Sequence, residues 1–583
     1  MMKKGGSRRD FLKTGAAGMV LAGGGSAALG QENGASSANP ETESPLTEET
    51  IRSAEAIFDV RYTDAERQMM VDGMEEWIDR MSRFRRISKP NELAPACSFD
   101  PRLLNVDYPE QDNQLVRSGQ DAGQLPSGDT DIAFAPVWRL SQWIERRQLS
   151  SRRLTDIYLE RISRHNGVLQ CFVTVTPEIA RAQADDADRE IAAGQYRGAL
   201  HGIPYGMKDI IDIADIASTW GATPYRDRVA SETAFIADRL REAGAVLLGK
   251  TTNGAIAYGD IWFDGVTKNP WNPEEGSSGS SAGSASSTAA GLVAFSIGTE
   301  TLGSIVSPSN RCGTTGLRPT FGRVSRHGAM ALCWSLDKIG PITRSVEDAG
   351  LVLEVLNGFD RQDPGAIEMG FSADFTRDVR GMRVGFDPAW FELGSDADRA
   401  TLEAARSAGV DLVEITLPDL PYDALFAVVE AESAAAFEEL TLTDQDDDLR
   451  WQAPFAWPNT WRQARFISAI DLINVDRFRR QVMREMHTLF EGLDAMIGPN
   501  FAGAMLTITN YTGHPQLAIK SGFNEIASRA AFDVEPANPD TLYRVPQTTS
   551  LWAPLFQEGN ILALGREIEN RLGVADMRPP LFS

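Results

Sequence analysis

The sequence predicts an α/β fold in which helices cover a mixed or parallel β-sheet. Short apolar runs alternate with helical patterns along most of the chain, among them GIPYGMKDII (residues 202–211), GAVLLGKT (244–251) and GLVAFSIGTE (291–300). Such alternation is typical of strands that are covered by helices. The chain has 583 residues, 42% of them hydrophobic, which is ample for a large buried core. No internal repeat divides it.

Residues 1–30 are predicted to be a twin-arginine signal peptide. Arg8 and Arg9 stand in the string SRRDFLK, and a weakly apolar stretch rich in Gly and Ala follows. That stretch is too short to span a bilayer comfortably, although a membrane anchor or a chance basic patch is the alternative. Small residues near Ala28 suit cleavage. We therefore expect export to the periplasm or the extracellular space, with no stable membrane insertion of the mature chain.

The next two segments are predicted to precede the main domain. Residues 31–46 are polar and indicate a disordered linker. Residues 47–130 are predicted to form a helical extension followed by an extended loop, because helical periodicity runs only to about residue 87. These helices are suited either to cap the sheet or to form a homodimer. The main α/β domain is expected over residues 131–583.

Charge and cysteine content exclude several functions. The net charge is −24, which argues against a nucleic-acid partner, because phosphates require clustered Lys and Arg. The four cysteines are irregularly spaced and predict neither a disulfide framework nor a metal site. We expect no metal and no cofactor.

Two motif matches are rejected on physical grounds. Residues 244–251 fit the phosphate-loop pattern, but the residues between the glycines are Ala-Val-Leu-Leu and favour a buried strand. Residues 279–283 fit the G-x-S-x-G elbow with Ser281 as nucleophile. Loop material precedes that match, and none of the five histidines is marked as its partner. A Ser-His-Asp esterase using Ser281 stays an alternative.

Two loops of small residues flank one apolar strand. The stretch GSSGSSAGSASSTAAG (276–291) could by composition be a flexible tether. It feeds directly into an apolar run, however, and a second Gly/Ser turn follows at 301–309, which indicates backbone packed around a ligand. Upstream, Lys208 lies in an apolar run. It is either a snorkelling lysine or a buried neutral base.

These segments together resemble the amidase signature family from about residue 140 to 575. The matching pieces are GIP with KD (202–209), SGSSAGSA (278–285), GTETLGSIV (298–306), CGTTGLRP (312–319) and TGHPQLAIKSGF (512–523). Each piece is weak alone, but their order and spacing are specific. The resemblance implies one α/β/α domain around a large twisted mixed sheet of about eleven strands.

The resemblance also implies a Ser–cis-Ser–Lys mechanism. Ser304 would be the nucleophile, Ser280 the bridging serine after a cis peptide, and Lys208 the base. The chemistry is consistent, because burial lowers a lysine pKa and a hydroxyl both donates and accepts a proton. The N–H groups of Thr301, Leu302 and Gly303, with that of Ser304, would stabilise the oxyanion. The implied activity is hydrolysis of a linear amide through an acyl-enzyme.

The sequence departs from the family pattern near the nucleophile. Leu302 replaces a glycine, Val306 stands where the family usually has Arg, and Glu300 where it has Asp. If the Arg and the Asp of the family pattern normally form an ion pair, that pair is lost here, and with it the support that it gives to this turn. Arg318 in place of Lys is a mild change. Ala255 replaces an acidic residue of the related segment.

Residues 420–465 are expected to set specificity. Trp451 and Trp457 lie in an aromatic-rich stretch, which indicates either helix packing or a wall for an aryl or apolar group. The predicted partner is a small amide. The alternatives are an A-type amidotransferase subunit that releases ammonia from glutamine, and a non-catalytic binding protein on this fold. The predicted export and Ala255 argue against the amidotransferase.

Overall fold

The computed structural model describes residues 46–529, 538 and 540–583. It divides into two compact units, with the boundary between Phe84 and Arg85. The predicted signal peptide and nearly all of the predicted linker, residues 1–45, lie outside the described residues. Among the helices that are described, none has the length and the apolar character needed to cross a membrane.

The first unit contains two helices, α2 (Glu48–Phe58) and α3 (Asp64–Arg85). Thr47 begins α2 with a capping box, in which its side chain accepts the backbone N–H of Thr50. A buried ion pair joins the helices, with Arg67 Nε 2.6 Å from Glu55 Oε1. The helical periodicity of residues 47–87 therefore corresponds to two helices. Residues 85–130 fold with the larger unit.

The larger unit is built on a mixed sheet of eleven strands in the order β14-β13-β15-β17-β16-β10-β11-β9-β3-β4-β2. Its strands are β2 (Phe172–Val175), β3 (Pro204–Lys208), β4 (Val246–Thr251), β9 (Phe295–Glu300), β10 (Thr315–Arg318), β11 (Lys338–Thr343), β13 (Arg383–Phe386), β14 (Asp411–Glu414), β15 (Ala495–Pro499), β16 (Gln516–Ala527) and β17 (Leu542–Trp552). Strand β3 is parallel to β4 and β9, whereas β9 is antiparallel to β11. The expected large mixed sheet is confirmed.

Three two-stranded sheets accompany the large one. They pair β1 (Gln114–Val116) with β12 (Ser372–Asp374), β5 (Ile261–Trp262) with β6 (Gly265–Val266), and β7 (Lys268–Asn269) with β8 (Asn272–Gly276). The first pair ties the loop before the main domain to a strand far along the chain. This pairing explains why residues 85–130 belong to the larger unit.

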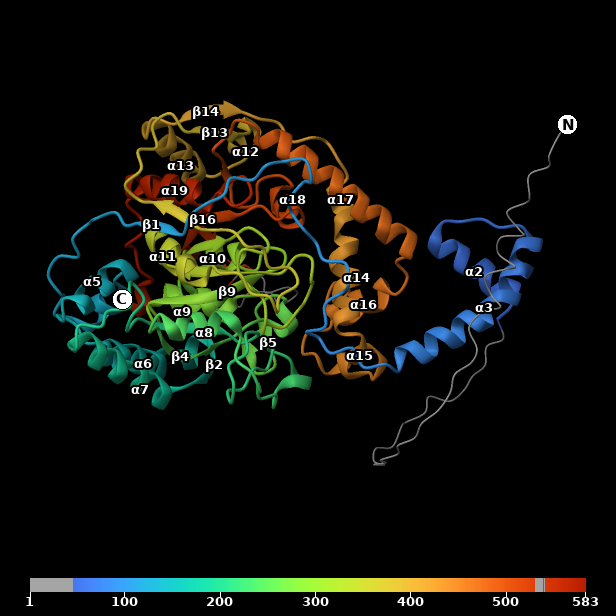
Figure 1. The fold of residues 1–583 in the computed structure, drawn as a ribbon, viewed down its shortest axis with the longest axis horizontal. Helices are drawn as coiled ribbons and strands as arrows, with labels where there is room; N and C mark the ends of the chain where they lie inside the picture. The colour runs from blue at the N-terminus through green and yellow to red at the C-terminus, as the bar shows by residue number, and fades with distance from the viewer. Residues whose placement is uncertain (1–45, 530–537, 539) are drawn as a thin grey trace. The chain divides into compact units, whose positions relative to one another are not determined.

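The larger unit has helices, some of which pack on the sheet and others mainly on neighbouring helices. They are α4 (Asp129–Phe134), α5 (Val137–Glu145), α6 (Ser151–Leu169), α7 (Pro177–Ala192), α8 (Phe235–Glu242), α9 (Ala282–Ala289), α10 (Val306–Cys312), α11 (Val346–Leu356), α12 (Pro388–Glu392), α13 (Asp396–Ser407), α14 (Phe426–Ala436), α15 (Glu438–Leu442), α16 (Trp457–Ala464), α17 (Ala469–Phe490), α18 (Met505–Thr512) and α19 (Glu558–Leu572). Figure 1 shows α6 and α7 beside β4 and β2, and α19 near α13 and β16. Helix α6 begins after Ser150, whose side chain accepts the backbone N–H of Arg153.

The central strands are buried on both sides. Every residue of β3, β4 and β9 is buried, as the continuous apolar runs of the sequence predict for strands covered by helices. The parallel register pairs Met207 of β3 with Ile297 of β9. Lys208 and Thr299, which follow these residues, are thereby brought to the same end of the sheet.

Candidate functional site

Lys208 ends strand β3 with its side chain fully buried. Its Nζ donates to three hydroxyl oxygens: Ser280 Oγ at 2.9 Å, Ser281 Oγ at 3.1 Å and Thr299 Oγ1 at 2.7 Å. Burial lowers the pKa of this lysine to about 7, although the charges of Asp337 and Glu300 oppose the shift. The snorkelling interpretation is wrong, because no part of the side chain reaches water.

The stretch 276–291 is buried structure and not a tether. The peptide bond between Gly279 and Ser280 is cis, and α9 follows, with all eight of its residues buried. A Cβ on Gly279 would lie 1.8 Å from the carbonyl oxygen of Gly259, so no other residue fits there. The small side chains therefore allow this segment to pack directly on the backbone of its neighbours.

Ser304 lies in the turn between β9 and α10 and is 8% exposed. Its carbonyl oxygen accepts the N–H of Ser281 at 3.1 Å, which joins this turn to the loop of Ser280. Gly303 has a φ of 91°, a conformation that favours glycine. In the described part of the chain, no hydrogen bond occupies the N–H groups of Leu302, Gly303 and Ser304. These groups are therefore free to bind an oxyanion.

A buried ion pair supports the turn from behind. Glu300 Oε2 accepts the backbone N–H of Ile305 at 2.8 Å and of Val306 at 3.1 Å. Its Oε1 accepts from Arg318 at 2.7 Å and from Asn510 Nδ2 at 3.0 Å. The sequence left this support open because Val306 replaces an arginine. The structure supplies the cation from Arg318, the residue that the sequence analysis treated as a mild change.

Ser304 faces a cavity of about 360 Å³. The residues that line it are Tyr258, Gly259, Asp260, Gly276, Ser278, Gly279, Leu302, Gly303, Ser304, Ser307, Arg311, Phe501 and Leu506. The predicted pocket residues Trp451 and Trp457 are not among them. Their rings contact the lining residue Tyr258, with ring centroids 5.1 and 4.9 Å from that of Tyr258.

Sequence reasoning did not name several lining residues, among them Tyr258, Asp260 and Arg311. Tyr258 lies within the segment in which Ala255 replaces an acidic residue, Asp260 follows that segment, and Arg311 lies in α10. A usable signal existed for Arg311, because it is a charged residue only seven positions after Ser304. Tyr258 and Asp260 carried no such signal.

The structure agrees with the physical grounds on which the phosphate-loop match and the G-x-S-x-G match were rejected. Residues 246–251 form the buried strand β4, and Lys250 Nζ lies 3.4 Å from Asp209 Oδ1. Ser281 hydrogen-bonds to Lys208, Thr299 and Ser304, and its bonds within the described residues include none to a histidine. Nor does any group of three or more His, Cys, Asp or Glu suited to a metal ion occur among the residues described.

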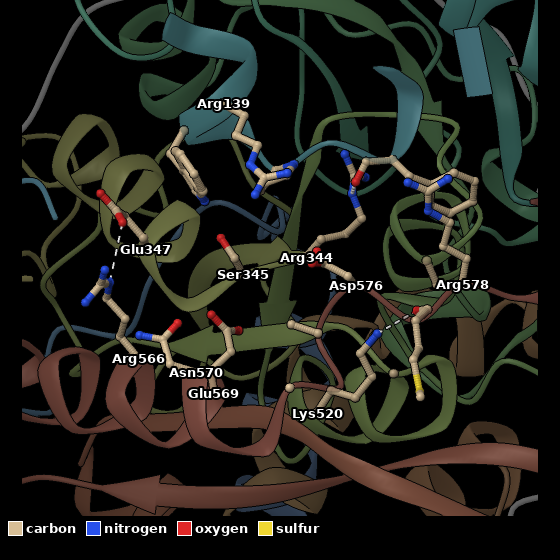
Figure 2. Close-up of a pocket in the computed structure, with 18 of the residues that line it drawn as sticks. Arg139, Arg344, Ser345, Glu347, Lys520, Arg566, Glu569, Asn570, Asp576 and Arg578 are labelled. Atoms are coloured by element: carbon tan, nitrogen blue, oxygen red, sulfur yellow. Dashed lines mark hydrogen bonds and ion pairs between the residues drawn. The ribbon is translucent and has the colours of Figure 1, made fainter. Parts of the chain in front are cut away.

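A second cavity, of about 230 Å³, is separate from the first (Figure 2). Its charged lining residues are Arg139, Arg344, Glu347, Lys520, Arg566, Glu569, Asp576 and Arg578. It shares no lining residue with the cavity of Ser304. Arg344 is satisfied by the carbonyl oxygens of Phe134, Ala135, Thr288 and Val293, which marks it as structural.

Comparisons with known proteins agree with this geometry. A family model described as Amidase matches residues 153–521, more than half of the chain. The A-type subunit of the glutamyl-tRNA(Gln) amidotransferase of Methylococcus capsulatus is 38% identical over 309 residues, which cover 51% of this chain and 64% of that relative. The chain thus spans slightly less than two thirds of this relative's length.

Two solved structures share the fold. The peptide amidase of Stenotrophomonas maltophilia matches with a TM-score of 0.67 and 27% identity, over 78% of this chain and 100% of that one. An inhibitor-bound vestigial protein complex, which reveals the evolutionary origins of an s-triazine catabolic enzyme, matches with a TM-score of 0.66 and 26% identity. That match covers 75% of this chain and 99% of the other.

Removing the cation behind the turn tests its structural role. In Arg318→Met, Glu300 would lose, in a fully buried position, the guanidinium that pairs with it at 2.7 Å. We expect the free energy of unfolding, measured with urea, to fall by about 3–5 kcal/mol. The double variant Arg318→Met/Glu300→Gln should lose less than the sum of the two single variants. Additive losses would contradict coupling, and Arg380→Met at an exposed pair is the control.

Proposed function

The chain belongs to the Amidase family, and from this premise we propose that it hydrolyses the carbon–nitrogen bond of a small linear amide. Ser304 is the proposed nucleophile, Ser280 the proton relay and Lys208 the base. The observation that carries the proposal is the position of Lys208 Nζ, fully buried and 2.9 Å from Ser280 Oγ. A neutral amine in that position accepts a proton from a hydroxyl.

The proposed reaction proceeds in two halves. Ser304 Oγ attacks the amide carbon while its proton passes to Ser280, whose own proton passes to Lys208. The tetrahedral oxyanion is stabilised by the N–H groups of Thr301, Leu302, Gly303 and Ser304. The carbon–nitrogen bond then breaks, and the amine leaves with the proton returned through Ser280. Water cleaves the acyl ester by the same relay and regenerates the serine.

The cavity walls support an aryl or apolar substrate. Tyr258, Leu302, Phe501 and Leu506 present apolar surface beside Ser304. Trp451 and Trp457 contribute to this wall through Tyr258, which they contact. We therefore propose that these tryptophans act on selectivity by holding Tyr258 in place.

A second candidate is glutamine hydrolysis by an A-type amidotransferase subunit. The 38% identity to the corresponding protein of Methylococcus capsulatus favours it. Ala255 in place of an acidic residue and the twin-arginine string argue against it. An esterase that uses Ser281 has less support, because Ser281 Oγ donates to the carbonyl oxygen of Thr299.

We expect the chain to be exported by the twin-arginine route, on the basis of Arg8 and Arg9. Export predicts that the protein recovered outside the cytoplasm begins near residue 31. N-terminal sequencing of the exported protein measures this directly. Replacement of both arginines by lysine should retain the chain in the cytoplasm with its N-terminus intact. An unprocessed chain recovered outside the cytoplasm would contradict the proposal.

The nucleophile is tested by labelling with a fluorophosphonate probe. We expect Ser304→Ala to lose both labelling and hydrolysis of a neutral aryl amide, because only Ser304 is placed to attack. Ser281→Ala should still be labelled, whereas the esterase alternative requires the opposite. Labelling that persists in both variants leaves a non-catalytic binding role. Ammonia release from glutamine, followed in the same preparations, separates the amidotransferase candidate.

The base predicts the pH profile. Neutral Lys208 is the active form and exists above its pKa of about 7, so kcat/KM should rise with pH and level off above about 7. The charge of Asp337 raises this pKa. Asp337→Asn should therefore move the acid limb to lower pH, whereas Asp378→Asn at the exposed surface should not. An acid limb that does not move in Asp337→Asn would argue that Lys208 is not the titrating base.

A further inference from the structure

Arg311 and Ser304 lie along one face of the cavity. Ser304, Ser307 and Arg311 follow one another at intervals of three and four residues, and all three line the cavity. Helix α10 carries Ser307 and Arg311, and Ser304 comes just before it. Ser307 and Arg311, four residues apart in α10, share one helical face. The cavity therefore brings the side chain of Ser304 and a guanidinium to the same space.

Among the residues that the structure describes, none accepts a hydrogen bond from the guanidinium of Arg311. Its side chain is 21% exposed, and its one ion pair in the described chain is with Glu275 Oε2 at 3.5 Å. No hydrogen bond of this side chain to another described residue is found. A guanidinium carries five N–H donors, and no nitrogen of Arg311 is among the fully buried atoms of the described chain that lack a partner, so these donors are accessible from the cavity.

Glu275 cannot supply the missing acceptors. It accepts Arg529 Nη2 at 2.6 Å, Arg529 Nε at 3.1 Å and the backbone N–H of Arg529 at 2.8 Å. Asn269 Nδ2 donates to it at 2.8 Å as well. A carboxylate has about four acceptor positions, and these four bonds use them. The 3.5 Å contact with Arg311 is thus a charge contact alone.

Asp260 is the other acid that faces Arg311 in the cavity. Its Oδ2 accepts the backbone N–H of Ser278 at 2.8 Å, and the side chain is buried. Burial raises the pKa of this carboxyl group, which weakens it as a counter-ion. No hydrogen bond joins Asp260 to Arg311, both of which lie in the described part of the chain. The guanidinium therefore keeps donors for a ligand.

We infer that Arg311 binds an anionic group of the substrate, so that the preferred substrates are amides with a carboxylate separated from the reactive carbonyl by an apolar body. Guanidinium groups bind carboxylates with two parallel hydrogen bonds, which suits this role. The apolar walls formed by Tyr258, Leu302 and Phe501 lie beside the same cavity. This inference rests on the proposed amide hydrolysis at Ser304 and adds the substrate class.

A purely structural role for Arg311 is the competing explanation. A cation in the last turn of α10 stabilises the helix C-terminus and the nearby Glu275. Such a role predicts a change in unfolding free energy without a change in the ratio between charged and neutral substrates. Substrate pairs that differ only in charge therefore separate the two explanations.

The test compares matched amides with the full chain. Terminal carboxyacyl 4-nitroanilides from succinyl to suberoyl are paired with neutral acyl 4-nitroanilides of equal chain length. A second set places the carboxylate on the amine side, as acyl 4-aminobenzoates against acyl anilides. We expect the wild type to prefer the anionic member in at least one set. Arg311→Gln should reduce that preference, measured as a ratio of kcat/KM, by about 10- to 100-fold, mainly through KM.

Two further variants sharpen the result. Arg311→Lys keeps the charge but not the forked geometry and should retain part of the preference. Arg380→Gln makes the same change of net charge at an exposed pair and should leave the ratio as in the wild type. If Arg311→Gln fails to fold, the preference of the wild type and of Arg311→Lys still decides the question.

The inference is overturned if the wild type does not prefer the anionic member in either set. An unchanged ratio in a folded Arg311→Gln would overturn it equally. Neither result affects the proposed nucleophile, which is judged by Ser304→Ala on the neutral amide. Conversely, neutral-amide hydrolysis that persists in Ser304→Ala would contradict the proposed function itself.

Discussion

The burial of one lysine among hydroxyl groups is the constraint on which the site depends. Lys208 Nζ has three hydroxyl acceptors and, among the described residues, no carboxylate at ion-pair distance. A charged ammonium in such a position is costly, so burial drives the group toward its neutral form. The acceptors come from β9 and from the loop before α9. Water is therefore excluded from the lysine only if both segments pack closely on β3. The glycines and serines around it make that close packing feasible.

This constraint explains what could be predicted from the sequence. Lys208 interrupts an apolar run, and the stretch 276–291 has the composition of a linker but leads straight into a buried strand. Both are conflicts between local composition and context, and such conflicts are visible without a structure. The same logic rejected the phosphate-loop match, because Ala-Val-Leu-Leu between its glycines favours burial. The large mixed sheet followed from the alternation of apolar runs and helices together with the family resemblance.

The remaining features depend on contacts between distant segments. Glu300 and Arg318 are eighteen residues apart, and Gln516, almost two hundred residues further on, accepts from the same guanidinium. No local sequence pattern predicts these contacts, which form because β10 lies between β11 and β16 in the sheet. Arg311 is similar: within the described chain its donors lack a hydrogen-bond acceptor because Arg529 occupies acceptor positions of Glu275. Which charges are left unsatisfied is decided by competition in three dimensions.

A comparison of Lys208 with Lys250, two of the buried lysines of the sheet, shows how the protein separates catalysis from structure. Lys208 and Lys250 lie on neighbouring strands, and both are completely buried. Lys250 Nζ is 3.4 Å from Asp209 Oδ1, so a charged lysine there is offset by a charged partner. The described partners of Lys208 Nζ are hydroxyl groups, which stabilise the neutral amine as well as the ammonium. Burial lowers the pKa of both lysines. Of the two, only Lys208 contacts a hydroxyl group that lies on the proposed proton path to Ser304. Hydroxyl partners in place of a carboxylate, more than burial as such, are therefore what suits this lysine to act as a base.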